Sequence, residues 1–596
     1  MLSYIDLSVI GIYLLGILAL GFFLQKKAGK SIDAYFLGNR KMPWWALGAS
    51  GMASNTDIAG TMVITAMIYV MGLKGFFVEV RGGIVLVMAF FMIFMGKWTR
   101  RANVMTLAEW MKLRFGEGRE GQIARFICAV ANIVISIWII SFFAVGGGKF
   151  LGEFLGMNDQ LASVLLIVLA MVYTAASGFY GVVWTDVLQG GMILFSILYV
   201  CYIAMDLVSL PEAFQVSVPL KDGGFELMSV KLSEWTNFWP PMETEFPGKY
   251  SIYNLFGVTI LFYFIKTFIE GFGGAGGYMS QRYFAAKSDR EAGLLSVFWI
   301  LLLAFRWPLV MAFATLAIYH GMTQGVIEDP ELVLPVVINE YIPVGFKGLL
   351  IACFIAAAMS TFDSVINSSA AYWVKDIYHI HINPKATDKQ LMTQSRVSSV
   401  AIVVIGLLFS FPVVNINDIW GWITMAFGSG IFVPLLLRWY WWRYNGYGFA
   451  AGIVLGMIAA VGIKFTSVAV PEYMNFVIPG GFALLGCILG TLLTPQTNPE
   501  TLKNFYIKTR PFGFWGKIKK ELPEADQKSI DQETRRDLMA IVLAVPWQLS
   551  LFIMGMMFII KQWDQFFMLL SGFLVLSVGL YFSWFRHLNA NEKLER

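Results

Sequence analysis

Charged side chains are scarce in this sequence. Asp, Glu, Lys and Arg make up 14% of its 596 residues, whereas a soluble domain carries about a quarter. Hydrophobic residues reach 57% and aromatic residues 16%. Helices that face lipid need such a composition, and a soluble core of this length does not. The scarcity of charge argues against several soluble domains and favours one membrane domain.

Histidine and cysteine are also scarce, with four of each. The cysteines fall inside apolar runs, which indicates small core residues and neither a disulfide set nor a metal site. The histidines stand at run ends or in loops and form no zinc or catalytic cluster. A membrane enzyme would need such a cluster of His, Asp or Cys, so we expect no enzymatic activity and no organic cofactor. The net charge is only +5 and the basic residues cluster in the loops between apolar runs, so we expect no nucleic acid partner.

Apolar runs long enough to cross a bilayer are abundant. A window of about 20 residues finds about fifteen. They are 4–24, 44–66, 72–98, 125–150, 158–178, 181–207, 252–278, 288–320, 346–376, 396–414, 416–441, 447–466, 474–494, 538–560 and 564–587. Basic residues gather in alternate loops, above all after the first, third and thirteenth runs. The positive-inside rule then predicts a multi-pass plasma-membrane protein with its N-terminus outside and its C-terminus in the cytoplasm.

Two of these runs are interrupted by glycine and polar residues at membrane depth, at 48–60 and at 270–278. Each interruption leaves backbone groups without helical partners, which a membrane tolerates only where they line a cavity or bind an ion. The interrupted runs are the second and the seventh, the first helices of two candidate five-helix halves. Broken helices in matching positions of two repeats are typical of a transporter's binding site. Close helix packing through glycine is the alternative.

Ionisable residues inside membrane runs usually serve function. Here they are Asp57, Glu79, Arg81, Asp186, Lys266, Glu270, Arg306 and Asp363. Lys266 and Glu270 are four residues apart, which favours a structural ion pair along one helix face. Arg306 fits a solute that bears a carboxylate, or it neutralises Glu79 or Asp57.

A second polar patch occupies residues 357–369. On a helix it places Ser360, Asp363, Ser364 and Asn367 on one face. Hydroxyl, carboxylate and carbonyl oxygens suit a hard cation, so this face and the freed carbonyls of residues 53–56 could hold sodium. A hydrogen-bonded seam between helices is the alternative.

Four segments resemble motifs of the sodium:solute symporter family, which includes the sodium/glucose, proline, pantothenate and sialic acid transporters. They are Ser31–Trp45, Thr106–Gly116, Trp184–Gln189, and 357–369 followed by Asp376–Tyr378. The resemblance covers roughly residues 1–495, and Ala108 departs from it where the family often has Pro. It implies alternating access and an all-α membrane protein whose 5+5 inverted-repeat core has the fold of the bacterial leucine transporter.

These patterns divide the chain into five parts. Residues 1–43 hold an extra span and a cytoplasmic loop, and residues 44–445 form the transporter core of two inverted repeats. Two additional spans follow at 446–495, then a cytoplasmic loop at 496–537. Two C-terminal spans and a tail occupy 538–596.

The resemblance also implies sodium sites. Carried over residue by residue, the first uses the carbonyls of Ala53, Thr56 and Ala357 and the hydroxyls of Ser360 and Thr361. A second sodium, which some members bind, would use Asp186, Ser360, Asp363 and Ser364. Asp363 stands where some members have Ser, so it could strengthen that site or bind a proton.

The family's solute-binding positions can be carried over to this sequence less directly than its sodium sites. Tyr278 matches an inner-gate tyrosine of the sugar-transporting branch, Glu79 falls where that branch has a sugar-binding Glu, and Arg306 lies near its Lys. Asn55 and Asp57 of the broken helix complete the expected solute-binding set. However, the branch carries polar sugar contacts at three positions that are glycine here, namely Gly60, Gly276 and Gly421, which weakens a sugar assignment.

We therefore expect sodium-coupled symport of a small organic solute, which could be a sugar, an amino acid or a carboxylate. Proton coupling on the same fold is an alternative, because Asp57, Asp186 and Asp363 can all titrate. A membrane sensor that binds solute without transport is another. The loop at 496–537 is too short for the kinase domain that such a sensor would need.

Overall fold

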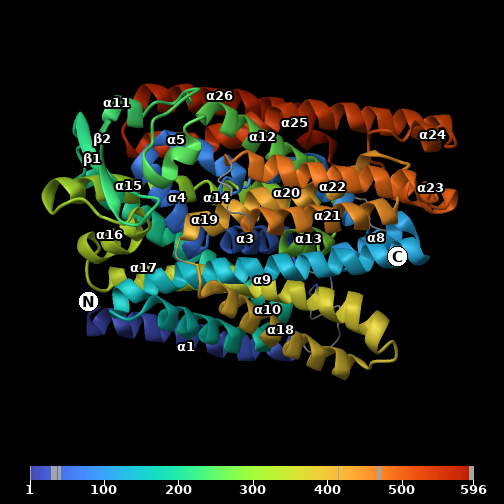
Figure 1. The fold of residues 1–596 in the computed structure, drawn as a ribbon, viewed down its shortest axis with the longest axis horizontal. Coiled ribbons are helices and arrows are strands. Elements are labelled where there is room, and N and C mark those ends of the chain that lie inside the picture. The colour runs from blue at the N-terminus through green and yellow to red at the C-terminus, as the bar shows by residue number, and fades with distance from the viewer. Residues whose placement is uncertain are drawn as a thin grey trace.

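A computed structural model of the chain describes residues 2–28, 37, 40, 42–274, 276–413, 415–465 and 471–588. Within these ranges the chain is a bundle of helices that run lengthwise beside one another (Figure 1). Eleven helices are long and apolar enough to cross a membrane, and three shorter apolar helices accompany them. The all-α membrane class is confirmed, while the number of about fifteen spans stays a prediction. Most of the motif at 31–45 lies outside the described residues.

The first half of the bundle contains the first broken helix and the long helices that follow it. Its elements are α1 (Tyr4–Ala28), α3 (Trp44–Asn55), α4 (Ile58–Met71), α5 (Leu73–Val78), η2 (Glu79–Arg81), α6 (Val87–Phe90), η3 (Phe91–Met95), α7 (Gly96–Arg101), α8 (Leu107–Phe115), α9 (Arg119–Leu155) and α10 (Asp159–Leu207).

The second half begins with the second broken helix. Its elements are α12 (Phe256–Gly273), α13 (Gly277–Phe284), α14 (Asp289–Leu303), α15 (Arg306–Thr323), η5 (Pro330–Leu332), α16 (Val333–Tyr341), α17 (Phe346–Ala371), η6 (Tyr372–Ile382), α18 (Asp388–Ser410), α19 (Ile416–Gly421), η7 (Trp422–Phe427) and α20 (Gly428–Tyr440). After it come α21 (Gly446–Phe465), α22 (Met474–Leu492), α23 (Pro499–Thr509), α24 (Gly516–Lys519), α25 (Glu524–Ile559) and α26 (Trp563–Ser583).

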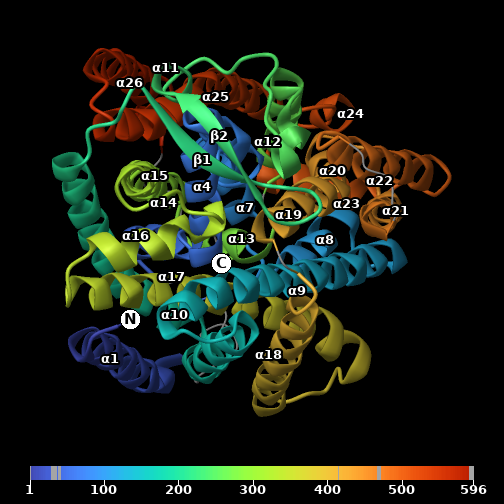
Figure 2. The ribbon, with the colours of Figure 1, turned by 60° about the vertical axis from the view of Figure 1, so that its left-hand side comes forward.

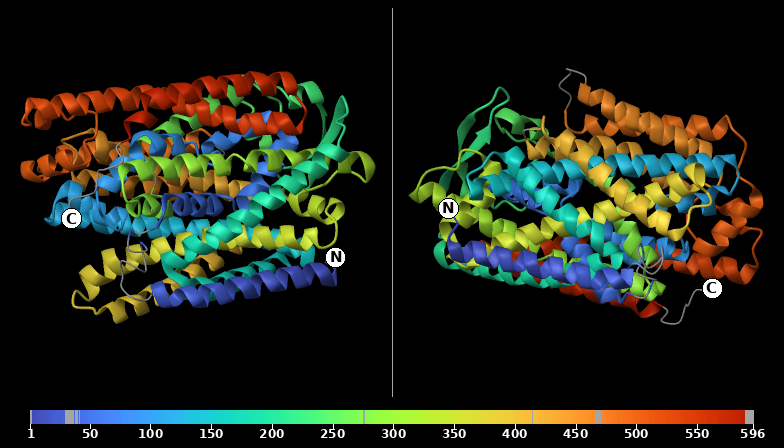
Figure 3. Two further views of the ribbon diagram at one scale, coloured as in Figure 1. Left: turned by 180° about the vertical axis from the view of Figure 1, so that it is seen from behind. Right: turned by 90° about the horizontal axis from the view of Figure 1, so that it is seen from below.

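The loop expected outside the membrane, 208–250, contains the strands β1 (Ala213–Pro219) and β2 (Phe225–Lys231), followed by α11 (Leu232–Trp235) and, at its end, η4 (Gly248–Tyr253). The strands pair antiparallel, from Ala213 opposite Lys231 to Pro219 opposite Phe225. The hairpin crosses one end of the bundle (Figure 2). The start of α1 lies at that same end, and α23 and α24 lie at the other (Figures 1 and 3). This arrangement is compatible with the orientation that the basic loops predict.

Both expected helix interruptions are present. The first lies between α3 and α4, where Thr56 leaves helical geometry and the Asp57 carboxylate accepts a hydrogen bond from the backbone N–H of Gly60 at 2.5 Å. That bond caps α4, because an aspartate oxygen satisfies an N–H group that a helix start leaves unpaired. The second lies between α12 and α13, where Gly274 has φ +79°, a conformation that glycine adopts without a steric penalty.

The last two long helices pack against the earlier ones. Gly555 of α25 lies against Pro308 of α15, where a methyl group would come within 2.9 Å of the proline ring. The buried amide of Gln548 donates to the carbonyls of Ile84 and Val85, at 3.4 and 3.2 Å. Residues 82–86 belong to no helix, and Val85 has φ +52°. The Val85 carbonyl also accepts from the backbone N–H of Met88 in α6 at 3.0 Å, so the amide from α25 adds a second donor there and gives the Ile84 carbonyl a donor from outside this irregular stretch.

Candidate functional site

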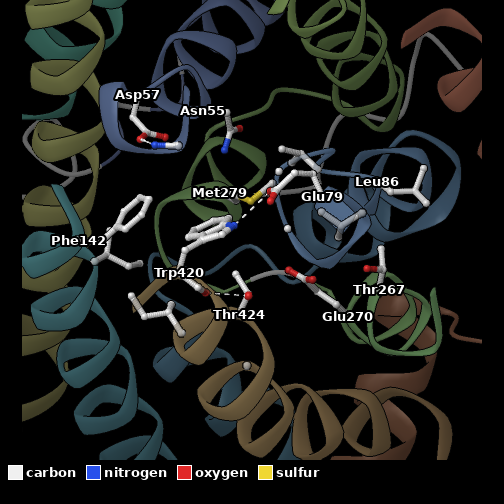
Figure 4. Close-up of a pocket in the computed structure, with 18 of the residues that line it drawn as sticks. Asn55, Asp57, Glu79, Leu86, Phe142, Thr267, Glu270, Met279, Trp420 and Thr424 are labelled. Carbon is white, nitrogen blue, oxygen red and sulfur yellow. Dashed lines mark hydrogen bonds between the residues drawn. The ribbon is translucent and has the colours of Figure 1, made fainter. Parts of the chain in front are cut away.

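Residues at or beside the two helix breaks line one cavity of about 210 Å³ (Figure 4). All five expected solute-binding residues line it, namely Asn55, Asp57, Glu79, Tyr278 and Arg306. They come from four separate parts of the chain, and the fold brings them together. Further lining residues come from α9, α12, α17 and the segment α19–η7.

The breaks contact each other directly. The Asn55 amide donates to the Tyr278 hydroxyl at 3.0 Å. The Asn55 carbonyl, one of the groups that the break frees, accepts from the Arg306 guanidinium at 2.7 Å. Arg306 also donates to the Thr61 hydroxyl at 3.3 Å. Arg306 thus satisfies backbone and side chain of the first broken helix, as a buried cation requires.

Glu79 lies at another side of the cavity and is fully buried. One of its oxygens accepts from Arg81 at 2.9 Å, and the other accepts from the indole of Trp420 at 3.3 Å. Figure 4 shows the Trp420 ring pointing its nitrogen at this carboxylate. Arg81 is held in turn by Tyr253 at 2.9 Å, Asn417 at 2.5 Å and Glu472 at 3.8 Å.

The ion pair expected between Lys266 and Glu270 is confirmed, at 2.8 Å. Lys266 also donates to the carbonyl of Arg81 at 2.6 Å, and the Thr267 hydroxyl donates to that of Val80 at 2.7 Å. The second broken helix is therefore tied to the short segment that carries Glu79.

Trp420 contributes an aromatic surface as well as a donor. Its ring stacks on Phe142, with centroids 5.0 Å apart and planes at 25°, and Figure 4 shows the two side by side. The cavity thus combines carboxylates with a stacked pair of aromatic rings. A mostly apolar lining with a few precisely positioned polar groups is common in small-molecule sites.

The residues expected to hold the first sodium lie where α3 packs against α17. Thr56 and Ala357 line one small cavity between helices. The hydroxyl of Ser360 lies 3.3 Å from that of Ser54 in α3. The Thr361 hydroxyl donates to the Ala357 carbonyl at 3.1 Å, and the backbone N–H of Thr56 donates to the Ala53 carbonyl at 3.3 Å. All five residues are buried and offer hydroxyl or carbonyl oxygens, the ligand type that hard cations take.

A residue that the sequence analysis missed lies beside them. The seventh run was expected to end at 278, but α13 continues to Phe284 and buries Arg282 completely. One of its nitrogens donates to the hydroxyls of Ser50 at 2.8 Å, Ser54 at 2.6 Å and Ser364 at 3.0 Å. The position of Arg282, four residues after Tyr278 and so one helical turn on, was the signal that could have revealed it.

Arg282 lies beside the residues that were expected to form the second sodium site. Asp186 accepts from the Ser50 hydroxyl at 2.5 Å and lies 3.6 Å from the Arg282 guanidinium. Ser364 contacts Ser54 at 2.8 Å as well as Arg282. Asp363 is buried on α17, next to Ser364 in sequence. Two of the four expected ligands, Asp186 and Ser364, therefore already face a cation of the protein.

Two of the sequence motifs contact each other. The Asp376 carboxylate accepts from the hydroxyl of Thr106 at 2.7 Å and from Arg125 at 2.6 Å. Thr106 also caps α8, since its hydroxyl accepts from the backbone N–H of Glu109. These motif residues connect α8 and α9 to η6 and lie outside the lining of the cavity.

Comparison with known proteins places this arrangement among transporters. Residues 35–456 match the model of the sodium:solute symporter family. A sodium/glucose cotransporter of Vibrio parahaemolyticus is 26% identical over 544 residues, which cover 86% of this chain and 94% of that protein. Human sodium/myo-inositol cotransporter 2 is 26% identical over 514 residues, covering 76% and 70%.

Among solved structures, a sodium-coupled sialic acid symporter in a substrate-bound, outward-open state aligns with a TM-score of 0.65 at 20% identity. The alignment covers 83% of this chain and 99% of that one. This likeness shows the fold, and the fold class expected from the sequence is confirmed.

Proposed function

The chain belongs to the sodium:solute symporter family, and we propose that it carries a neutral polyhydroxylated solute, a sugar or a polyol, together with sodium by alternating access. The family and its multi-pass helices support sodium-coupled solute transport and not enzymatic catalysis. The narrower choice of solute comes from the cavity.

This choice rests on one observation: the two basic residues that line the cavity, Arg306 and Lys266, already have partners within the protein. Arg306 already donates to the Asn55 carbonyl and to Thr61, and Lys266 is paired with Glu270. The Nε–H of Arg306 is buried without a partner, but a solute carboxylate that bound the two terminal guanidinium nitrogens or Lys266 would have to displace these partners and leave buried groups unsatisfied, which is costly. The carboxylates of Glu79 and Glu270 instead offer acceptors for hydroxyl groups.

Trp420 adds to this argument. Its indole nitrogen donates to Glu79, one face of its ring stacks on Phe142, and the residue lines the cavity. A sugar or polyol presents hydroxyls at its edge and C–H groups on its face, so one molecule can use the carboxylate and the ring together. The relatives named for glucose and myo-inositol support the same class.

The glycines that weakened the sugar assignment have charged or polar neighbours. A methyl group at Gly60 would come within 2.8 Å of Arg306 and 2.9 Å of Asp57. At Gly421 it would come within 3.1 Å of Glu472 and 3.3 Å of Arg81. Of these neighbours, Arg306 and Asp57 line the cavity, so in this proposal polar groups replace a side chain of the sugar branch at Gly60. Gly276 faces Asn132 in the same way, at 3.1 Å.

Sodium is proposed to bind between α3 and α17, at Ala53, Thr56, Ala357, Ser360 and Thr361. An ion there would fix the end of α3, and Asn55 at that end contacts Tyr278 across the cavity. Such an ion shifts the equilibrium between the outward-facing and inward-facing states only as far as its affinities for the two states differ. In this proposal residues 44–445 form the moving core in the plasma membrane, with the N-terminus outside and the C-terminus in the cytoplasm.

The test is uptake into liposomes that contain the purified protein. Labelled glucose, myo-inositol, proline and sialic acid are compared under an inward sodium gradient, a potassium gradient and a proton gradient. Sodium-driven accumulation of glucose or myo-inositol, reduced in Glu79→Gln, supports the proposal. Accumulation of proline or sialic acid alone refutes the solute class, and accumulation driven only by protons refutes the ion. Sodium-dependent binding of a solute without accumulation would indicate the sensor.

A further inference from the structure

A second cavity, of about 120 Å³, lies where α25 and the end of α26 meet α7 and α14. It is lined by acidic, basic and aromatic side chains from five parts of the chain. The basic loops assign this end of the bundle to the cytoplasm. The cavity shares no lining residue with the solute cavity, and α25 and α26 lie beyond residues 35–456, the part that matches the family model.

The acidic residues of this cavity are already neutralised. Glu533 pairs with Lys97 at 2.7 Å and with Arg101 at 2.9 Å. Asp537 pairs with Lys97 at 2.8 Å, and Asp289 pairs with Arg101 at 2.8 Å. Each carboxylate in the lining therefore has a cation of the protein beside it.

Hydrogen-bond donors remain after this pairing. Arg510 and Arg536 also line the cavity, and within the described residues neither guanidinium makes an ion pair or a hydrogen bond. The indole nitrogen of Trp584 is buried without an acceptor, in a side chain that is only 6% exposed, and the Ser583 hydroxyl has no partner. Arginine and tryptophan can only donate, so this set is complementary to an anion.

We propose that this cavity binds a phosphate group, carried by the headgroup of an anionic lipid. Arginine matches the geometry of phosphate oxygens, and basic pockets between helices on the cytoplasmic side are typical of anionic headgroup sites. The helix that ends at the cavity, α26, exposes apolar residues such as Val575 (72%) and Val578 (58%), a surface on which acyl chains can lie. Headgroup and chains would then join the last two helices to the core.

Lipid binding to the full-length protein tests this proposal. The protein is purified in a neutral detergent and titrated with phosphatidylglycerol, phosphatidylcholine or inorganic phosphate. Native mass spectrometry counts retained lipid, and the melting temperature reports stabilisation. We expect retention of phosphatidylglycerol over phosphatidylcholine, with about tenfold weaker binding in Arg536→Gln and Trp584→Phe, the latter removing one N–H and keeping the ring. A tenfold change corresponds to the loss of one good charged contact.

Arg535→Gln is the matched control, because Arg535 is exposed, adjacent on the same helix and absent from the cavity lining. Equal retention by the wild type and both cavity variants would overturn the proposal. An equal loss in the Arg535 variant would also overturn it, since general surface charge would then explain the effect. Stabilisation by inorganic phosphate alone, lost in the cavity variants, would support the anion site and identify its ligand as soluble phosphate.

Discussion

Arg282 is expected to limit transport to one sodium per solute. Its guanidinium lies 3.6 Å from Asp186 and 3.0 Å from Ser364, so an ion bound to the same oxygens would lie about 4 Å from it. Two unit charges at that separation repel by about 4 kcal/mol at an effective dielectric constant of about 20. At about 1.4 kcal/mol per tenfold, a second sodium would bind nearly a thousandfold more weakly than without Arg282.

The assay measures both fluxes in the same liposomes, with labelled sodium and labelled solute, together with the reversal potential. The wild type and Arg282→Lys, which keeps a positive charge, should move one sodium per solute. Arg282→Gln should move towards two, with steeper sodium dependence, because Asp186 loses its cation. A ratio of two in the wild type, or an unchanged ratio in Arg282→Gln protein that still folds and transports, would refute the reasoning.

Three further predictions concern single residues. Ser360→Ala should raise the sodium concentration for half-maximal uptake by roughly tenfold, since a hydrogen bond or contact to an ion is worth about 1.5–3 kcal/mol. Unchanged sodium dependence would show that Ser360 is not part of the sodium site. Glu472→Gln should raise the KM for solute severalfold and leave the maximal rate unchanged, because it removes one partner of Arg81, the residue that orients Glu79. The severalfold change corresponds to about 1 kcal/mol of coupling through the shared network. A change confined to the maximal rate would contradict this. Burial raises the pKa of Glu331, in η5 between α15 and α16, above its ordinary value, so the native protein holds that proton more tightly than the unfolded chain. Its contribution to stability should therefore fall as pH rises above about 4.3. The melting temperature of the Glu331→Gln variant should fall less over this pH range than that of the wild type.

The sequence could predict which residues share this cavity because the signals for them are local. A glycine-rich interruption in an apolar run is visible without knowledge of the fold, and so is a lone charge such as Asp57 or Arg306. All five expected solute residues do line one cavity. The residues that complete it, Trp420 and Phe142, look like ordinary aromatic residues of a membrane helix until the fold stacks them.

Arg282 was missed for a different physical reason. The hydrophobic run fades before it, and a helix interrupted at Gly274 and resumed at Gly277 gives no periodic signal long enough to extend the span. Its partners, such as Ser54 and Asp186, come from α3 and α10. A buried cation that is neutralised by distant elements cannot be told from a loop arginine until those elements are placed.

The hydrogen bonds from Gln548 have a consequence for how the protein can be shortened. They reach the carbonyls of Ile84 and Val85, and Val85 itself lines the solute cavity. A chain cut after α22 would keep nearly everything that resembles the family, yet it would lose the amide that donates to these two carbonyls beside the proposed solute cavity. We therefore expect that a shortened version of this protein has to include α25 to keep its function.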